Sequence, residues 1–328
     1  MPYLECRDLR RVFHHFTLDI SFSVDEGELM CILGPSGSGK STLLGAVSGT
    51  DSSVSGQILL DGEDITRMPI RNRRIGMVFQ DFSLFPSMDV ERNIQYGMKD
   101  MSESEKHAEV GRLLDMVDLA GYEKRQVHEL SGGEAQRIAL VRAVAAKPRM
   151  LLLDEPLSAL DAPLRKKLRT MIRQIHDQTG ITMLYVTHDR EEAFAIADRI
   201  MIMRGGKLEA AGTPEELYRH PSNLFTAFFT GEGSAIPMSC IDGYDSEKTL
   251  FFRPEDAIIG NPVSLEPHII LKGASMESHE YTGSGYLVRL SCKGCPILVM
   301  TRKKPDPEWA GAPVQISIPK DRAVILNG

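Results

Sequence analysis

Nine consecutive residues of the chain match a pattern that binds phosphate groups. Gly34 to Thr42 read Gly-Pro-Ser-Gly-Ser-Gly-Lys-Ser-Thr, which fits G-x-x-x-x-G-K-[ST]. In such a loop the backbone N–H groups surround a phosphate at the positive end of a helix. Lys40 supplies a charge for the β- and γ-phosphates of a nucleotide, and the Ser41 hydroxyl can ligate Mg²⁺. The residues expected to contact the nucleotide are Gly34, Pro35, Ser36, Gly37, Ser38, Gly39, Lys40, Ser41 and Thr42.

Two carboxylates follow a short apolar run farther along the chain. Met150 to Leu153 is predicted to be a buried strand, and Asp154 and Glu155 come directly after it. Asp154 is suited to hold Mg²⁺ opposite the glycine loop. Glu155 should face the γ-phosphate, where its carboxylate can take a proton from an attacking water or orient that water. The alternative is a pair of solvated acids that open a turn before Pro156, but the glycine loop favours the catalytic interpretation.

The segment Leu130 to Glu134, with the sequence Leu-Ser-Gly-Gly-Glu, allows two interpretations. In the structural one, Ser131 is the N-cap of a helix and Glu134 closes a capping box. In the functional one, the bare N–H groups of this glycine-rich helix start bind an anion. The residues concerned are Ser131, Gly132, Gly133 and Glu134. The chain's own nucleotide phosphates are already assigned to the Lys40 loop, so the anion is expected to come from a second subunit.

A histidine follows a third short apolar run, Met183 to Thr187. Taken alone, a histidine at such a strand end is more often a hydrogen-bonded core residue. In a chain with the other motifs, the imidazole of His188 can instead hydrogen-bond the γ-phosphate and detect its loss. Glu155 and His188 are therefore candidate catalytic residues.

These motifs fall at the ends of strands in a predicted α/β fold. Short buried strands at 29–33, 150–153 and 183–187 alternate with segments of helical periodicity, a pattern typical of a largely parallel sheet. In such sheets ligands bind beyond the carboxyl ends of the strands. After about Gly231 glycine, serine and proline become frequent. Short β-like runs separated by turns there predict a small β-barrel of about 90 residues.

Composition narrows the choice of function. With 328 residues, 42% of them hydrophobic, and a net charge of −7, the chain has the composition of a soluble two-domain protein and not of a nucleic-acid binder. No apolar run approaches the roughly 18 residues needed to span a bilayer, and the first residues lack a signal-peptide pattern. We therefore expect a cytosolic protein that reaches a membrane through a partner.

Cys292 and Cys295 form a lone C-x-x-C, which predicts reduced thiols because no second ligand pair for zinc lies nearby.

Taken together, the motifs resemble those of the ATP-binding cassette (ABC) proteins. The similar segments, in chain order, are 34–42 (Walker A), 78–80 (Q-loop), 130–134 (signature), 150–156 (Walker B), 158–161 (D-loop) and 187–189 (H-switch). Their order and spacing agree with the family across residues 1–232. Three further segments, Leu84–Pro86, Ala211–Tyr218 and Arg253–Asp256, resemble importers with a C-terminal TOBE-type barrel.

The resemblance implies a fold and its boundaries. It predicts a P-loop NTPase ABC cassette, with a RecA-like core and a helical subdomain, over residues 1–232. The helical subdomain is expected at about residues 86–150. A small OB- or TOBE-like β-barrel is expected at residues 236–328.

The resemblance also assigns roles to single residues. Phe13 is expected to stack on adenine, with Phe16 as an alternative because the segment after Phe13 is shorter than in many relatives. Gln80 is expected to reach Mg²⁺ or the attacking water, which makes it a third catalytic candidate, and to complete the Mg²⁺ site of Ser41 and Asp154. Asp161 is expected to contact the glycine loop of an opposing subunit. Glu134 stands where relatives often have glutamine, and since either residue closes the capping box, we expect full activity.

The implied mechanism needs several partners. A second copy of the chain is expected to sandwich ATP between one Lys40 loop and the other copy's Ser131 helix. Two integral-membrane permease subunits are expected to dock near residues 82–90 and to serve an extracytoplasmic solute-binding protein. The chain should therefore be peripheral, on the cytoplasmic face of the cell (inner) membrane, and should bind no nucleic acid.

Other functions stay open at this stage. A non-transport ABC ATPase of DNA repair or translation usually carries two cassettes or a long coiled coil, and this chain has a single cassette and no sustained heptads. A kinase or GTPase would have no use for the signature or the Asp161 loop. The solute is not specified, because importers of this group serve ferric iron, polyamines, molybdate, sulfate, thiamine or sugars. The general character of the sequence favours an inorganic ion or a polyamine as the transported solute.

Overall fold

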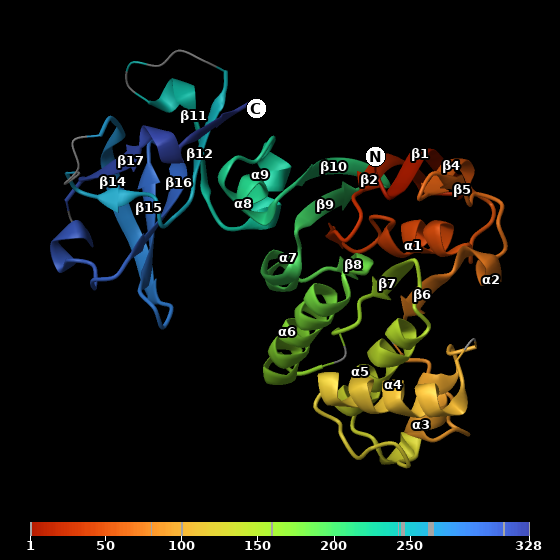
Figure 1. Ribbon diagram of the computed structural model, residues 1–328. Coiled ribbons are helices and arrows are strands. Elements are labelled where there is room, and N and C mark those ends of the chain that lie inside the picture. The colour runs from red at the N-terminus through yellow and green to blue at the C-terminus, as the bar shows by residue number, and fades with distance from the viewer. Residues whose placement is uncertain are drawn as a thin grey trace. The chain divides into compact units, whose positions relative to one another are not determined.

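The structure is a computed structural model that describes residues 2–79, 81–99, 101–158, 160–241, 243, 247–261, 266–310 and 312–327. The chain divides into two compact units, Met1–Pro214 and Glu215–Gly328. Figure 1 shows both, with the second unit in teal and blue. This division by contacts falls earlier in the chain than the functional boundary expected from the motifs, which stays a prediction.

The first unit is built on a six-stranded sheet with the strand order β10-β9-β3-β8-β7-β6. Its strands are β3 (Leu29–Leu33), β6 (Ile75–Val78), β7 (Met150–Asp154), β8 (Thr182–Thr187), β9 (Arg199–Arg204) and β10 (Lys207–Gly212). Neighbours pair in parallel except β10, which pairs antiparallel with β9. Every residue of β3 and β8 is buried, as expected for strands covered on both faces. The predicted parallel α/β sheet is confirmed.

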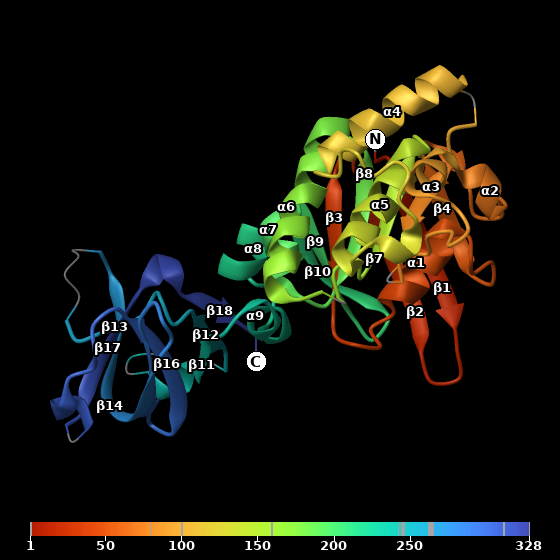
Figure 2. The same cartoon turned by 90° about the horizontal axis from the view of Figure 1, so that it is seen from below.

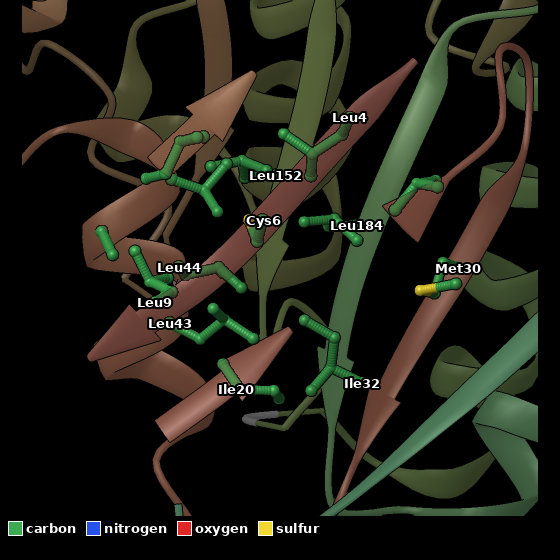
Figure 3. Packing of buried hydrophobic residues seen from close by; sticks show 14 of the residues in the cluster. Leu4, Cys6, Leu9, Ile20, Met30, Ile32, Leu43, Leu44, Leu152 and Leu184 are labelled. Atoms are coloured by element: carbon green, nitrogen blue, oxygen red, sulfur yellow. The ribbon is translucent and has the colours of Figure 1, made fainter. Parts of the chain in front are cut away.

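A second, antiparallel sheet packs with the first helix against one face of the six-stranded sheet. Its strands, in the order β2-β1-β4-β5, are β1 (Leu4–Val12), β2 (Thr17–Val24), β4 (Ser55–Leu60) and β5 (Glu63–Asp64). Figure 3 shows Leu4 of β1, Leu44 of α1 (Lys40–Ser48) and Leu152 of β7 within this core. Burying a leucine contributes about 1.5–3 kcal/mol, so the helix after the phosphate loop is firmly held.

Three of the other helices of the first unit form a group, called the helical group below. α3 (Val90–Gln95), α4 (Glu103–Met116) and α5 (Gly132–Ala145) contact one another and lie together at the bottom of Figure 1. α6 (Ala162–Thr179) contacts α7 (Arg190–Ile196), which packs on β3 and β8, and α2 (Ile70–Arg73) is a single turn. The buried residues of α4 are Val110, Leu113 and Leu114, which lie on one face of the helix. None of the helices in the described ranges is long and apolar enough to cross a membrane.

The second unit begins with two short helices, α8 (Pro214–Arg219) and α9 (Leu224–Thr230), and continues as an antiparallel β structure. One sheet has the strand order β11-β12-β18 and the other β13-β17-β14-β15-β16. The strands are β11 (Ser234–Pro237), β12 (Thr249–Phe252), β13 (Ile258–Ile259), β14 (His268–Tyr281), β15 (Tyr286–Cys292), β16 (Cys295–Thr301), β17 (Val314–Pro319) and β18 (Val324–Leu326).

The long strand β14 curls the second unit around a core of its own. Its first half pairs with β17 and its second half with β15. The register shifts between Leu271 and Ala274 and again between Met276 and Ser278. Gly273 lies in the first shift with a φ of +77°, a backbone region that favours glycine. The curled antiparallel sheet, which is visible in Figure 2, confirms the predicted barrel-like class of this unit.

Three of the five cysteines lie in the second unit. Cys292 and Cys295 flank the turn between β15 and β16, and the Sγ atom of Cys240 lies 3.9 Å from that of Cys295. All the cysteines are described, and none is in a disulfide. Within the described part of the chain, no three His, Cys, Asp or Glu side chains are arranged to hold a metal ion. The sequence spacing gave no sign of Cys240, because the fold alone brings it to the C-x-x-C turn.

Candidate functional site

The phosphate loop connects a fully buried strand to a helix. β3 ends at Leu33 between β8 and β9, and α1 begins at Lys40. Gly39 precedes the helix with a φ of +101°, the left-handed region that favours glycine. At Gly34 a Cβ atom would lie 2.5 Å from the carbonyl oxygen of Met203, so a larger residue would clash with β9. These two glycines allow the tight turn that presents backbone N–H groups in front of α1.

The side chain of Lys40 is held across the loop. Its ammonium donates to the carbonyl oxygen of Gly34 at 2.8 Å and to that of Pro35 at 3.0 Å. Lys40 is only 6% exposed. Burial lowers the pKa of Lys40, and the carboxylates of Glu155 and Asp154 oppose that shift. The ammonium group therefore lies within the phosphate loop, and its contact with the β- and γ-phosphates stays a prediction.

A cavity of about 550 Å³ opens beside the loop. The residues that line it are His15, Phe16, Ser36, Gly37, Gly39, Lys40, Ser41, Thr42 and Glu155. Most of them belong to the predicted phosphate loop, and they supply hydroxyl, ammonium and backbone donors. Phe16 adds an aromatic surface. A cavity of this size and composition can hold a nucleotide, with phosphates on the donors and a base against the ring.

Phe13 and Phe16 take different positions at this cavity. Phe16 lines it and touches the loop, since a Cβ atom at Gly39 would lie 2.6 Å from Phe16 Cζ. Phe13 is 41% exposed, and the guanidinium of Arg11 lies 4.7 Å from the centre of its ring. The two phenylalanine rings are 6.0 Å apart, so both stay candidates for the adenine contact. The sequence had not singled out His15, which also lines the cavity.

Ser41 and Asp154 lie side by side where the Mg²⁺ site is predicted. The Ser41 hydroxyl donates to Asp154 Oδ1 at 3.4 Å. Burial raises the pKa of Asp154 and the nearby Glu155 raises it further, while Ser41 and Lys40 lower it. A hydroxyl and a carboxylate are the hard oxygen ligands that Mg²⁺ prefers, and a cation would offset the crowding of the two carboxylates. The residues present therefore fit the predicted metal.

Glu155 and His188 meet at the ends of β7 and β8. The Nδ1 atom of His188 lies 3.1 Å from Glu155 Oε2. Glu155 has a φ of +44°, which is uncommon for a residue with a side chain. Its N–H donates to the carbonyl oxygen of Val186 at 3.0 Å, which holds this backbone in place. In this conformation the carboxylate lies beside the imidazole of His188 and in the lining of the cavity.

The signature segment forms the capped start of α5. The N–H of Ser131 donates to Glu134 Oε2 at 2.7 Å, and the N–H of Glu134 donates to Ser131 Oγ at 3.4 Å. The predicted capping box is therefore confirmed. The Tyr122 hydroxyl donates to Glu134 Oε1 at 2.7 Å. That bond and those from Ser131 lower the pKa of Glu134 to about 2.

The two glycines after Ser131 differ in their surroundings. Nothing lies within 4 Å of a Cβ atom placed at Gly132, whereas a Cβ at Gly133 would lie 2.7 Å from Leu164 of α6. Ser131 and Gly132 are exposed, so the start of α5 faces solvent. Among the described residues that line the cavity at Lys40, none belongs to the segment 131–134.

Of the two remaining predicted site residues, Asp161 is among the described residues and Gln80 is not. Asp161 is exposed and is the N-cap of α6, where its side chain accepts a hydrogen bond from the N–H of Leu164 at 2.9 Å. Gln80 lies outside the described residues, and its expected roles in catalysis and Mg²⁺ binding stay predictions.

The segment expected to meet membrane subunits, residues 82–90, is held by two side chains that sequence reasoning missed. Asn93 is fully buried, and its amide oxygen accepts from the N–H of Phe85 at 2.9 Å. Its amide N–H₂ group donates to three backbone carbonyls, those of Phe85, Met88 and Asp89. Arg142 of α5 donates to the carbonyls of residues 82 and 83. The segment 82–90 is thus held against α3 and α5 of the helical group.

Comparisons with known proteins agree with this geometry. The profile of the ABC transporter family matches residues 17–158. A sulfate/thiosulfate import ATP-binding protein of Chromobacterium violaceum is 42% identical over 318 residues, which cover 91% of this chain and 86% of that protein. An Fe(3+) ions import ATP-binding protein of Escherichia coli is 38% identical over 327 residues, which cover 93% of this chain and 92% of that protein.

A solved structure is similar to about two thirds of the chain. It is a dimeric ATP-binding cassette in a post-hydrolysis state, bound to ADP and Pi. It superposes with a TM-score of 0.57 and 28% sequence identity, and the match covers 64% of this chain and 98% of that one.

Proposed function

This chain belongs to the ABC transporter family as the ATP-hydrolysing subunit of an importer, and we propose how its residues perform that function. The observation that carries the proposal is that Lys40, Glu155 and His188 follow three different strands and meet at one edge of the sheet. A phosphate loop, a carboxylate and a histidine in mutual reach suit cleavage of a γ-phosphate. A non-transport ATPase is not favoured, because both named relatives are import proteins.

The residues of the cavity divide the chemistry among them. Lys40 and the loop N–H groups bind the β- and γ-phosphates, and an aromatic ring at Phe13 or Phe16 stacks on adenine. Ser41 and Asp154 hold Mg²⁺, which, when bound, supplies positive charge to the phosphate oxygens. Glu155 orients the attacking water and accepts its proton.

His188 supports that step from the end of the neighbouring strand. Its imidazole holds the carboxylate of Glu155 at a hydrogen-bond distance, and it contacts the γ-phosphate of bound ATP. Loss of the γ-phosphate removes this contact. The contacts of the imidazole therefore differ before and after hydrolysis.

A second copy of the chain completes the site. The exposed, capped helix start at Ser131 receives the γ-phosphate of ATP bound to the Lys40 loop of the other copy, and Asp161 contacts that loop. This arrangement is supported by the absence of the segment 131–134 from the described lining of the cavity, and by the dimeric state of the similar cassette. Closure of the pair on ATP is the motion that drives transport.

The remaining partners lie in the membrane. Two integral-membrane permease subunits dock on the segment 82–90 that Asn93 and Arg142 hold, so the chain sits on the cytoplasmic face of the membrane. The solute is proposed to be an inorganic ion or a polyamine, because the relatives include import proteins for both kinds of solute. Residues 1–232 form the functional cassette and residues 236–328 the barrel.

A change of Lys40 to alanine tests this assignment. It removes the cation held by the loop carbonyls, and we expect productive ATP binding and hydrolysis to be lost. Nucleotide-binding and phosphate-release assays on the full chain measure this, with Lys166→Ala, an exposed lysine of α6, as the control. Near-normal turnover of the Lys40→Ala protein would show that the cavity is not the ATP site.

A further inference from the structure

A buried carboxylate lies beneath the strand end that carries His188. Glu192 belongs to α7, which packs on β8, and is 3% exposed. Its Oε2 atom accepts hydrogen bonds from the Tyr185 hydroxyl at 2.9 Å and from the Thr187 hydroxyl at 2.8 Å. Both donors lie on the face of β8 that meets α7. A carboxylate at such depth is costly unless it is hydrogen-bonded, and here two hydroxyl groups satisfy one of its oxygens.

The same bonds fix the backbone on both sides of His188. The Thr187 hydroxyl, which donates to Glu192, also accepts from the N–H of Asp189 at 2.9 Å. Asp189 is in turn the N-cap of α7 and accepts from the N–H of Glu192 at 3.2 Å. Residues 187 and 189 are therefore tied to one carboxylate and one helix start. The imidazole between them projects outward, 58% exposed, toward Glu155.

Arg165 connects this arrangement to the loop around Asp161. Its guanidinium donates to Asp189 Oδ2 at 3.1 Å and to the carbonyl oxygen of Leu160 at 3.0 Å. Its Nε atom lies 3.7 Å from Glu192 Oε1 and, among described residues, has no hydrogen-bond partner. The charge of Arg165 thus lies between the second oxygen of Glu192 and the backbone next to Asp161. Arg165 thus links the turn that carries His188 to the loop of Asp161, which the proposed function places against the phosphate loop of the other copy.

We propose that Glu192 is a positioning residue for ATP hydrolysis, which orients His188 against Glu155 and links it, through Arg165, to the Asp161 loop. This inference rests on the proposed roles of Glu155 and His188. Packing alone does not call for a charged group here, because well-packed apolar residues often replace buried ionic groups without loss of stability. Two residues of this network, Thr187 and Asp189, flank the imidazole directly, so the carboxylate is placed to hold the turn that bears it.

The first test is Glu192→Gln in the full chain. The amide keeps the shape of the side chain but has only one oxygen. If that oxygen accepts hydrogen bonds from the Tyr185 and Thr187 hydroxyls, an N–H₂ group and not an oxygen faces Arg165. We expect kcat for ATP hydrolysis to fall about tenfold with KM for ATP changed by less than about twofold, since the loss concerns the chemical step and not binding. Glu191→Gln, an exposed neighbour on α7, is the matched control and should keep the wild-type rate.

Tyr185→Phe is a second, milder variant. It removes one donor to Glu192 and leaves the aromatic ring in the core, so it folds even where the amide variant does not. We expect it to lower kcat about threefold, again without a change in KM. Wild-type kcat in either folded variant would overturn the proposal.

A double-mutant cycle with His188→Ala separates positioning from general stability. If Glu192 acts through the imidazole, Glu192→Gln should change single-turnover phosphate release by less than about twofold in the His188→Ala background. The same fall in both backgrounds would overturn the inference while leaving the proposed function intact. Wild-type hydrolysis by His188→Ala alone would instead refute the proposed role of His188, and with it the role of Glu192.

Discussion

Replacing Arg73 by methionine should destabilise the helix that carries the phosphate loop. Arg73 is 1% exposed, and its guanidinium donates four hydrogen bonds to backbone carbonyls. Two go to Ala46 and Val47 in the last turn of α1, at 2.8 Å each. The other two go to Thr66 and Met68, at 3.0 and 2.9 Å. A positive group at the end of a helix also interacts favourably with the helix dipole.

The size of the effect follows from these bonds. Hydrogen bonds to charged groups contribute about 1.5–3 kcal/mol each, so the gross loss for the four is about 6–12 kcal/mol. The wild-type protein bears the desolvation penalty of a buried guanidinium, and the methionine variant does not. The absence of this penalty offsets much of the loss of hydrogen bonds. The variant leaves buried backbone carbonyls without their partner, each at a cost of about 1–3 kcal/mol, and we expect the free energy of unfolding to fall by about 3–5 kcal/mol in total. That is a large part of the roughly 5–15 kcal/mol by which proteins are stable.

Urea and thermal unfolding of the full chain measure the loss. Arg71→Met, an exposed arginine in the same helical turn, is the control and should change the free energy of unfolding by less than about 0.5 kcal/mol. If Arg73→Met also costs less than about 1 kcal/mol, the four bonds do not anchor α1 and the reasoning is refuted.

Two further predictions concern the helical group. Asn93→Ala should leave the ATPase rate of the isolated chain within about twofold of wild type. It should weaken copurification with membrane subunits at least about tenfold, because it removes the hydrogen bonds that hold the segment 82–90. Asn72→Ala, at an exposed position, is the control, and unchanged copurification of the Asn93→Ala chain would contradict the docking proposal. The folded pKa of Glu134, about 2, lies below the ordinary value of 4.5, so the stability its hydrogen bonds supply is present above pH 4.5 and is lost as the pH falls toward 2. Tyr122→Phe should raise that pKa toward 4.5, which NMR titration of the carboxyl carbon can detect, and an unchanged value would show that Tyr122 does not set it.

The local parts of the site could be predicted from the sequence. The phosphate loop is a continuous segment whose glycines, lysine and serine are required together, so its pattern is specific. The capping box at Ser131 and Glu134 is likewise defined within four residues, and the structure has it. The parallel sheet followed from short apolar runs such as 150–153, which are typical of strands covered on both faces.

Contacts between distant segments could not be predicted in this way. Glu192 looks like an ordinary acid in the first turn of a helix, and only the packing of α7 on β8 brings it to Tyr185 and Thr187. Arg73 is a basic residue in a basic stretch, and its burial depends on how α1 and the segment 66–68 fold around it. The adenine contact stayed open because it depends on the conformation of the loop that carries Phe13 and Phe16.

The central claim, that two copies of the chain enclose ATP and that Glu155 drives its hydrolysis, is tested most directly by Glu155→Gln. The amide keeps the side-chain shape and removes the proposed base, while Lys40, Ser41 and Asp154 are expected to bind Mg²⁺ and ATP as before. Hydrolysis should fall at least about a hundredfold, the usual effect of losing a positioned general base. Light scattering or gel filtration of the variant should then show a dimer that forms only with ATP.

Adding Ser131→Arg should abolish that dimer, because the bulky side chain would block the start of α5 where the partner's γ-phosphate is proposed to bind. The same trapping should occur in the full transporter, where the membrane subunits hold the two copies together. An ATP-dependent dimer of Glu155→Gln that disappears with Ser131→Arg is the predicted result. A Glu155→Gln chain that hydrolyses ATP normally, or that traps no ATP even within the full transporter, would contradict the account.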